Sequence, residues 1–191
     1  MQQIWLAFAL ISSIVSSRQP FAVQFVKEVS GRAVTICLDG RKVETTFAGK
    51  LGFRDRYHEW TSVCAAVRKP IVTGQYTAFR ARNSTSVGKN IAKAGNIVAH
   101  CFDAARTPDQ CAGLQVAVWE ALEDGGVRPN FLGGRFQVKA NEAILANAAM
   151  YYAAIVEEKS ATYLESANGK SQSQLSTGGI KPTPPKPPVD K

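Results

Sequence analysis

The feature that most constrains the fold is a change of hydrophobic pattern near Gly88, in the middle of the chain. Before it, apolar residues alternate with polar ones in short runs separated by glycine and proline, which is typical of half-buried strands. After it, alanine-rich segments repeat their apolar residues every three or four positions, as amphipathic helices do. We therefore expect an α+β fold, in which a small antiparallel, barrel-like sheet from the N-terminal half packs against a C-terminal group of helices.

The clearest strand signal is a hairpin centred on Asp39-Gly40. The flanking runs, 33–38 and 42–47, are rich in residues that favour strands, and the Asp-Gly dipeptide supplies the positive φ angles of a tight primed turn. Further strands are expected over 21–29, 61–67 and 75–80.

Three helices are expected in the second half. In the first, after Gly88, the residues Ile91, Ala94 and Val98 share one face. The second begins at an N-cap Thr107 followed by Pro108, and ends near Gly125. In this helix Gln115 borders the apolar stripe, one turn before Trp119. The third helix is expected over 141–166.

The two ends of the chain differ from the middle. Residues 1–17 carry no charge and include an apolar run too short to span a bilayer comfortably, which predicts a signal peptide cleaved just before Arg18. A buried N-terminal helix is the alternative. From Gly169 onward the chain is rich in Gly, Ser, Gln and then Pro, which favours an extended spacer. The expected organisation is a signal peptide (1–17), one domain (18–168) and a flexible Pro-rich tail (169–191) of a secreted or cell-surface protein, with no stable membrane span after cleavage.

Charge and motifs restrict the possible partners and activities. The net charge is +8, but Lys and Arg are spread along the chain without a dense patch, so a nucleic-acid partner is not expected. Outside the cytoplasm, an anionic surface or polysaccharide fits this charge better. The chain has no nucleophile elbow, phosphate-binding loop or dinucleotide fingerprint, and only two histidines, so no conventional enzyme, metal site or cofactor is expected.

Four cysteines, at positions 37, 64, 101 and 111, fit an oxidising compartment and allow three complete pairings. Cys101 and Cys111 flank the turn around Pro108, so a disulfide between them is possible. If Cys37 were also paired with Cys64, the protein would be a chemically inert, disulfide-stapled module.

The most specific segment is Gln115-Val116-Ala117-Val118-Trp119, which resembles the Q-x-A-[IV]-W motif of the thioester domain family. Three other segments resemble that family in the same order: 47–51 (FAGKL) is similar to a run in its secreted bacterial members, 71–76 (IVTGQY) to the segment after its cysteine strand, and 134–136 (GRF) to its short GxF element. Cys64, within Val63-Cys64-Ala65, occupies the place of the family's cysteine. The resemblance covers about residues 33 to 156. The motifs occur along the chain in the same order as in the family, which a single motif match would not show.

The resemblance implies a specific chemistry. In thioester domains a cysteine thiolate attacks a glutamine carboxamide of the same chain, releases ammonia and leaves an internal thioester; the pair implied here is Cys64 and Gln115. Trp119 would shield the product from water. By the same resemblance, the thioester captures an amine, for example a lysine of a partner, so the protein would act once as a covalent adhesin or cross-linker and would not turn over as an enzyme. The alternative remains the inert, disulfide-stapled extracellular binding or structural module.

Overall fold

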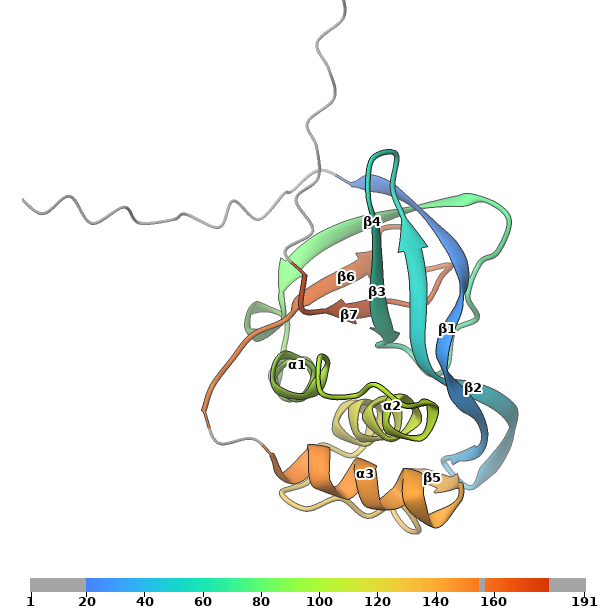
Figure 1. Ribbon diagram of the computed structural model, residues 1–191, viewed down its shortest axis with the longest axis vertical. Helices are drawn as coiled ribbons and strands as arrows, with labels where there is room; N and C mark the ends of the chain where they lie inside the picture. The colour runs from blue at the N-terminus through green and yellow to red at the C-terminus, as the bar shows by residue number, and fades with distance from the viewer. Residues whose placement is uncertain (1–19, 155–156, 179–191) are drawn as a thin grey trace, which may run out of the picture.

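Seven antiparallel strands lie over three helices in the computed structural model, which describes residues 20–154 and 157–178 (Figure 1). The expected signal peptide (1–17) and the proline-rich part of the expected tail lie outside the described residues. The elements in chain order are β1 (Phe21–Leu38), β2 (Arg41–Arg54), β3 (Glu59–Cys64), β4 (Tyr76–Asn83), a 3₁₀ turn (Ser84–Ser86), α1 (Lys89–Cys101), α2 (Pro108–Glu123), β5 (Phe136–Lys139), α3 (Glu142–Ala153), β6 (Thr162–Ser166) and β7 (Gln174–Ser176).

The sheet has the strand order β2-β3-β7-β6-β4-β1-β5, and β1 also pairs with β2, so the arrangement is ring-like without being a barrel. All of its pairings are antiparallel. The predicted α+β class is confirmed. The sheet is nevertheless not built from the N-terminal half alone, because β5, β6 and β7 come from beyond α2.

The predicted hairpin and two of the predicted helices are confirmed. Asp39 and Gly40 have φ angles of 50° and 73°, as the tight turn between β1 and β2 requires. At the start of α2, the Thr107 side chain accepts a hydrogen bond from the Gln110 N–H, and the Gln110 side-chain oxygen accepts one from the Thr107 N–H. Gly125, at φ 63°, follows the last turn of α2.

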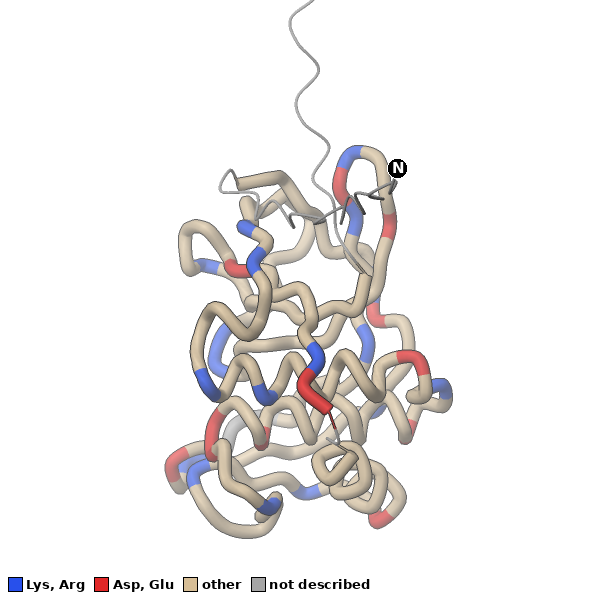
Figure 2. The backbone as a smooth tube through the Cα atoms, turned by 90° about the vertical axis from the view of Figure 1, so that its left-hand side faces the viewer, with Lys and Arg blue, Asp and Glu red and all other residues tan. Residues whose placement is uncertain are grey.

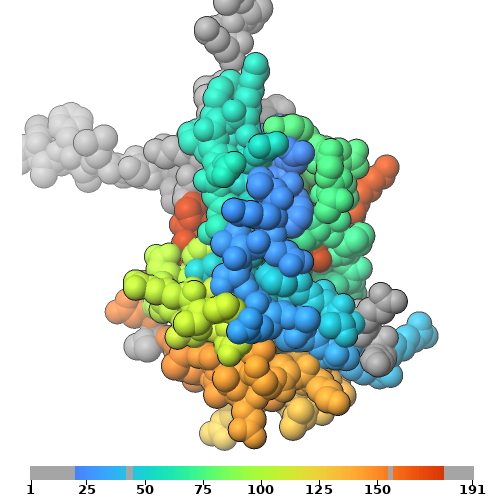
Figure 3. All heavy atoms as spheres, turned by 45° about the vertical axis from the view of Figure 1, so that its right-hand side comes forward, coloured from blue at the N-terminus to red at the C-terminus, as the bar shows by residue number. Residues whose placement is uncertain are grey.

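Helix α2 is the centre of the domain. Every residue from Cys111 to Ala121 is buried, because β1 and β2 pack on one side of the helix and α1 and α3 on others. In the space-filling view α3 (orange) lies at the end opposite the loop between β2 and β3 (teal) (Figure 3). A side chain on α2 therefore meets protein in every direction.

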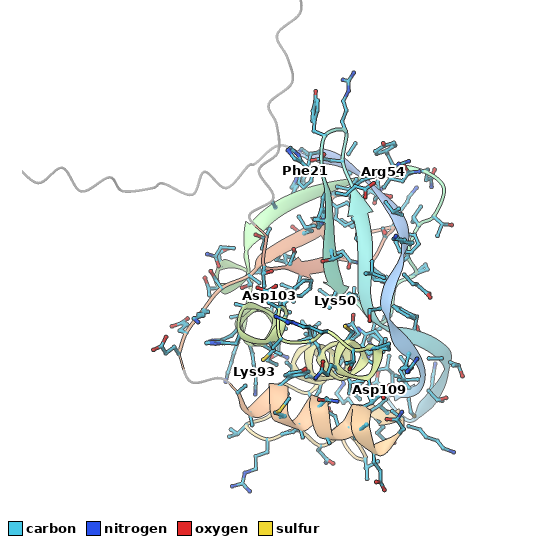
Figure 4. All side chains as sticks on the ribbon, viewed as in Figure 1. Phe21, Lys50, Arg54, Lys93, Asp103 and Asp109 are labelled. Atoms are coloured by element: carbon cyan, nitrogen blue, oxygen red, sulfur yellow. The ribbon has the colours of Figure 1, made fainter. Side chains whose placement is uncertain are left out.

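Lys50 ties the sheet to the helical layer. Its side chain extends from β2 toward the end of α1 (Figure 4), where its Nζ donates to the carbonyls of Phe102 at 2.7 Å and Ala105 at 2.8 Å. The ammonium also lies 4.2 Å from the centre of the Phe102 ring. Burial lowers the pKa of Lys50, and these contacts satisfy two of its donors. They hold the α1–α2 connection against β2.

Two expectations for the C-terminal part are wrong. The third helix was expected over 141–166, but α3 ends at Ala153 and Thr162–Ser166 is strand β6, paired with β4. The tail was expected from Gly169, but β7 lies within it, and Gln174, Leu175 and Ser176 are all buried. Both strands pair with edges that β3 and β4 leave open, and these long-range pairings outweigh local composition.

The packing of α2 against α3 yields a testable prediction. A Cβ on Gly113 would lie 2.6 Å from the Cβ of Asn147 and 3.0 Å from the carbonyl oxygen of Ile144, so the helices approach too closely for any side chain there. Gly113→Ala gains about 1 kcal/mol of helix propensity, but the clash costs about 1–3 kcal/mol, so we expect a lower free energy of unfolding in urea. Gly88→Ala, where no atom lies within 4 Å, is the control; equal stability of the two variants would contradict the prediction.

Candidate functional site

Cys64 and Gln115, the pair implied by the thioester resemblance, lie against each other. Cys64 is the last residue of β3, and Gln115 lies in the middle of α2. Gln115 Oε1 accepts a hydrogen bond from the Cys64 N–H at 2.7 Å, and Gln115 Nε2 donates to the Cys64 carbonyl at 2.8 Å. The side-chain amide thus binds both main-chain polar groups of the cysteine, which fixes its orientation at the residue that carries the sulfur.

The sulfur of Cys64 is buried and protonated at neutral pH. Cys64 is 2% exposed and Gln115 1%. Burial raises the pKa of the Cys64 thiol to about 11, and the hydrogen bond that Sγ accepts from the Ala66 N–H at 3.3 Å acts in the opposite direction without cancelling it. Trp119 also favours the thiolate, although its indole N–H forms no hydrogen bond of normal geometry.

Trp119 closes the site on the helix side. It lies one turn beyond Gln115 on the same face of α2, is 2% exposed, and meets the ring of Phe136 edge-on at 6.3 Å between centroids. Phe136 belongs to the 134–136 segment that resembles the GxF element. The two motifs are therefore in contact, and Trp119, Phe136 and Gln115 are all buried.

Two polar residues at this site were missed by sequence analysis. Gln174 of β7 is paired directly with Cys64, so the two side chains share a face of the sheet, and Ser62, two residues before Cys64, lies on that face as well. Ser62 Oγ donates to Gln174 Oε1 at 3.1 Å, while Gln174 Nε2 has no hydrogen-bond partner although the residue is 1% exposed. The sequence gives only a weak indication of Gln174, because it is a glutamine next to Leu175 in a segment whose composition otherwise predicts a flexible tail.

The four cysteines, all within the described residues, are free. Cys101 Sγ donates to the Tyr151 carbonyl at 3.9 Å and Cys111 Sγ to the Ala105 carbonyl at 3.3 Å, so the two thiols have different acceptors and the possible Cys101–Cys111 disulfide is not formed. The Cys37–Cys64 pairing of the alternative is not formed either, which leaves Cys64 available to Gln115.

His58 is exposed, and His100 Nε2 contacts the Glu157 carbonyl at 2.9 Å. No group of three metal-ligating side chains occurs among residues 20–154 and 157–178. In the same ranges, none of the helices is both long and apolar enough to cross a bilayer. Figure 2 shows basic positions scattered over sheet and helices without a dense patch.

Comparison with protein-family models, with curated proteins and with solved structures found no match to the chain. The interpretation of the site therefore depends on its geometry and on the motifs in the sequence.

A second buried titratable group on α2 lies apart from Cys64. Glu120 is 1% exposed; its Oε1 accepts from the Asn130 N–H at 2.8 Å, and its Oε2 has no partner. Burial raises the pKa of its carboxyl. Glu120 is five positions after Gln115, so the two side chains point about 140° apart around the helix axis. Glu120 is therefore not placed to serve as a base for Cys64.

The raised pKa of Glu120 predicts that the free energy of unfolding depends on pH. Because its folded-state pKa is raised, its contribution to stability is greatest below the ordinary glutamate pKa and is lost as pH rises through the raised value. Glu120→Gln keeps an acceptor for Asn130 and removes this loss, so its advantage over the wild type in urea unfolding should grow between about pH 4 and about pH 8. Glu59→Gln, at an exposed position, is the control. An advantage of Glu120→Gln that does not change with pH would contradict the assignment.

Proposed function

We propose that Cys64 and Gln115 condense to an internal thioester, and that the protein uses it once to attach itself covalently to an amine-bearing partner, as an adhesin or cross-linker. The observation that carries the proposal is the pair of hydrogen bonds between the Gln115 amide and the main chain of Cys64. An ordinary core glutamine needs hydrogen-bond partners, but it does not need the backbone of a free, buried cysteine as both of them. The order of the motifs supports the same pair.

The first step forms the thioester. Cys64 Sγ attacks the Gln115 side-chain carbonyl carbon, and the negative charge that develops on Oε1 meets the Cys64 N–H, which already donates to that oxygen at 2.7 Å. The thiol first loses its proton to hydroxide, so that the thiolate attacks; the amide nitrogen then takes a proton from water, the C–N bond breaks, and ammonia leaves. One C–S bond replaces one C–N bond, with no oxidant or cofactor. Because an amide is a poor electrophile, the fixed orientation of the Gln115 amide supplies much of what the reaction needs.

The second step consumes the thioester. A primary amine attacks the same carbonyl carbon, a C–N bond forms, the C–S bond breaks, and Cys64 returns as a thiol. The product is an amide between Gln115 and the partner, which is stable, so the protein does not turn over. Until the partner arrives, the burial of Cys64, Gln115 and Trp119 protects the thioester from hydrolysis.

The proposed chemistry fits an exported protein, in which an irreversible link to a surface is useful and no recycling is required. Export itself stays a prediction from residues 1–17. If the thioester does not form, the alternative of a noncovalent extracellular binding or structural module stands.

The proposal predicts a mass deficit. Intact mass spectrometry of the purified protein should find it lighter than its sequence by one ammonia. Treatment with methylamine should then add the mass of one whole methylamine molecule, because the thioester opens to an amide and a free thiol with no leaving group lost. Cys64→Ala and Gln115→Ala should each abolish the deficit and the adduct. Cys37→Ala and Gln137→Ala, which change the same residue types away from the site, should retain both. A folded wild type with an intact amide would rule out the thioester.

The pKa of Cys64 predicts how the reaction responds to pH. With a thiol pKa of about 11, about one molecule in ten thousand carries the thiolate at pH 7, and this fraction rises about tenfold for each pH unit. Protein recovered unfolded from inclusion bodies, in which the Gln115 amide has not yet reacted, should therefore lose ammonia faster on refolding as pH is raised from about 6 to about 9, with a slope near tenfold per unit. Quenched samples followed by mass spectrometry measure the rate. A rate independent of pH would mean that the thiolate is not the attacking species.

A further inference from the structure

An open groove of about 550 Å³ lies beside the candidate thioester. Three parts of the chain line it: the segment just after β3 (65–69), the start of α1 (88–91), and the end of α2 (Leu122 and Glu123). The floor is apolar and the residues nearest the site are small, because Ala65 and Ala66 directly follow Cys64.

The groove comes close to the reactive sulfur. Ala66 lines the groove, and its N–H donates to Cys64 Sγ at 3.3 Å. Leu122, also in the lining, lies one turn beyond Trp119 on α2. The main chain at Ala65–Ala66 therefore lies between the groove and the sulfur, and the two alanines add little side-chain bulk there.

The rim of the groove is positively charged. Arg68 is held between Asp39 at 2.9 Å and Glu123 at 3.0 Å, so its charge is compensated. Lys69 and Lys89 are exposed and form no ion pair with any described residue. The first turn of α1 contains no acidic residue, so the positive end of its dipole adds to these two charges.

We propose that the partner is a protein segment in which the reacting lysine is flanked by acidic residues, and that this groove receives it. The inference rests on the proposed thioester. Carboxylates on either side of the lysine complement Lys69 and Lys89, while the lysine side chain extends along the apolar floor toward Cys64.

The experiment compares two peptides that contain one lysine each, flanked either by Asp and Glu or by Arg. Their rates of adduct formation are measured by intact mass spectrometry at low salt on four proteins: the wild type, Lys69→Glu/Lys89→Glu, the control Lys139→Glu/Lys159→Glu with equal charge change at exposed sites, and Cys64→Ala. We expect the wild type and the control to favour the acidic peptide about tenfold, and the groove variant to lose or reverse that preference. Added salt should weaken the preference.

The outcomes separate the two proposals. If ammonia is lost and adducts form, but both peptides react equally on the wild type or the groove variant keeps the preference, the groove proposal is wrong and the thioester stands. Reaction with an amine-bearing anionic polysaccharide but with neither peptide would also overturn it. If ammonia is not lost and no protein forms an adduct, the thioester itself fails. An intact ammonia deficit in the groove variant shows that this variant has folded.

Discussion

The docking of one side-chain amide on the main chain of one cysteine is the interaction on which the site depends. It joins the last residue of a strand to the middle of a buried helix, and it is held only because both elements are fixed independently. Helix α2 is fixed by its capping box at Thr107 and by burial on all sides. Strand β3 is fixed by pairing with β2 on one edge and β7 on the other. The result is an amide held in one orientation on the main chain of the cysteine, within a region closed to solvent.

The burial that would preserve a thioester also opposes its formation, because it keeps Cys64 as a thiol. The structure offers partial compensation: the Ala66 N–H and Trp119 favour the thiolate, and the Cys64 N–H faces the oxygen that becomes charged. A slow reaction is acceptable for a bond that forms once in the life of the molecule. Such a site depends more on a fixed orientation of the Gln115 amide and on the exclusion of water than on a strong base.

Sequence reasoning found the parts of the fold that local chemistry specifies. The Asp39-Gly40 turn and the Thr107 cap are short-range signals, and both are present in the structure. The Cys64–Gln115 pair was found through motif resemblance, since nothing in periodicity places residues 51 positions apart together. Strands β6 and β7 were missed because they are short, and because their stability comes from edges provided by β3 and β4, about 80 residues or more earlier in the chain. Gln174 was missed for the same reason, because it belongs to β7.

The late position of β7 in the chain means that strand β3 completes its pairing only near the end of synthesis. Cys64 completes its strand pairing with Gln174, which is synthesised 110 residues later, and Ser62 contacts the same residue. In a chain that is still emerging from the ribosome, β3 lacks its β7 neighbour, and Cys64 lacks the pairing with Gln174. The domain therefore cannot assemble its closed pocket until nearly its whole length has been delivered. For the proposed thioester, late closure would delay the electrophile until the chain is almost complete.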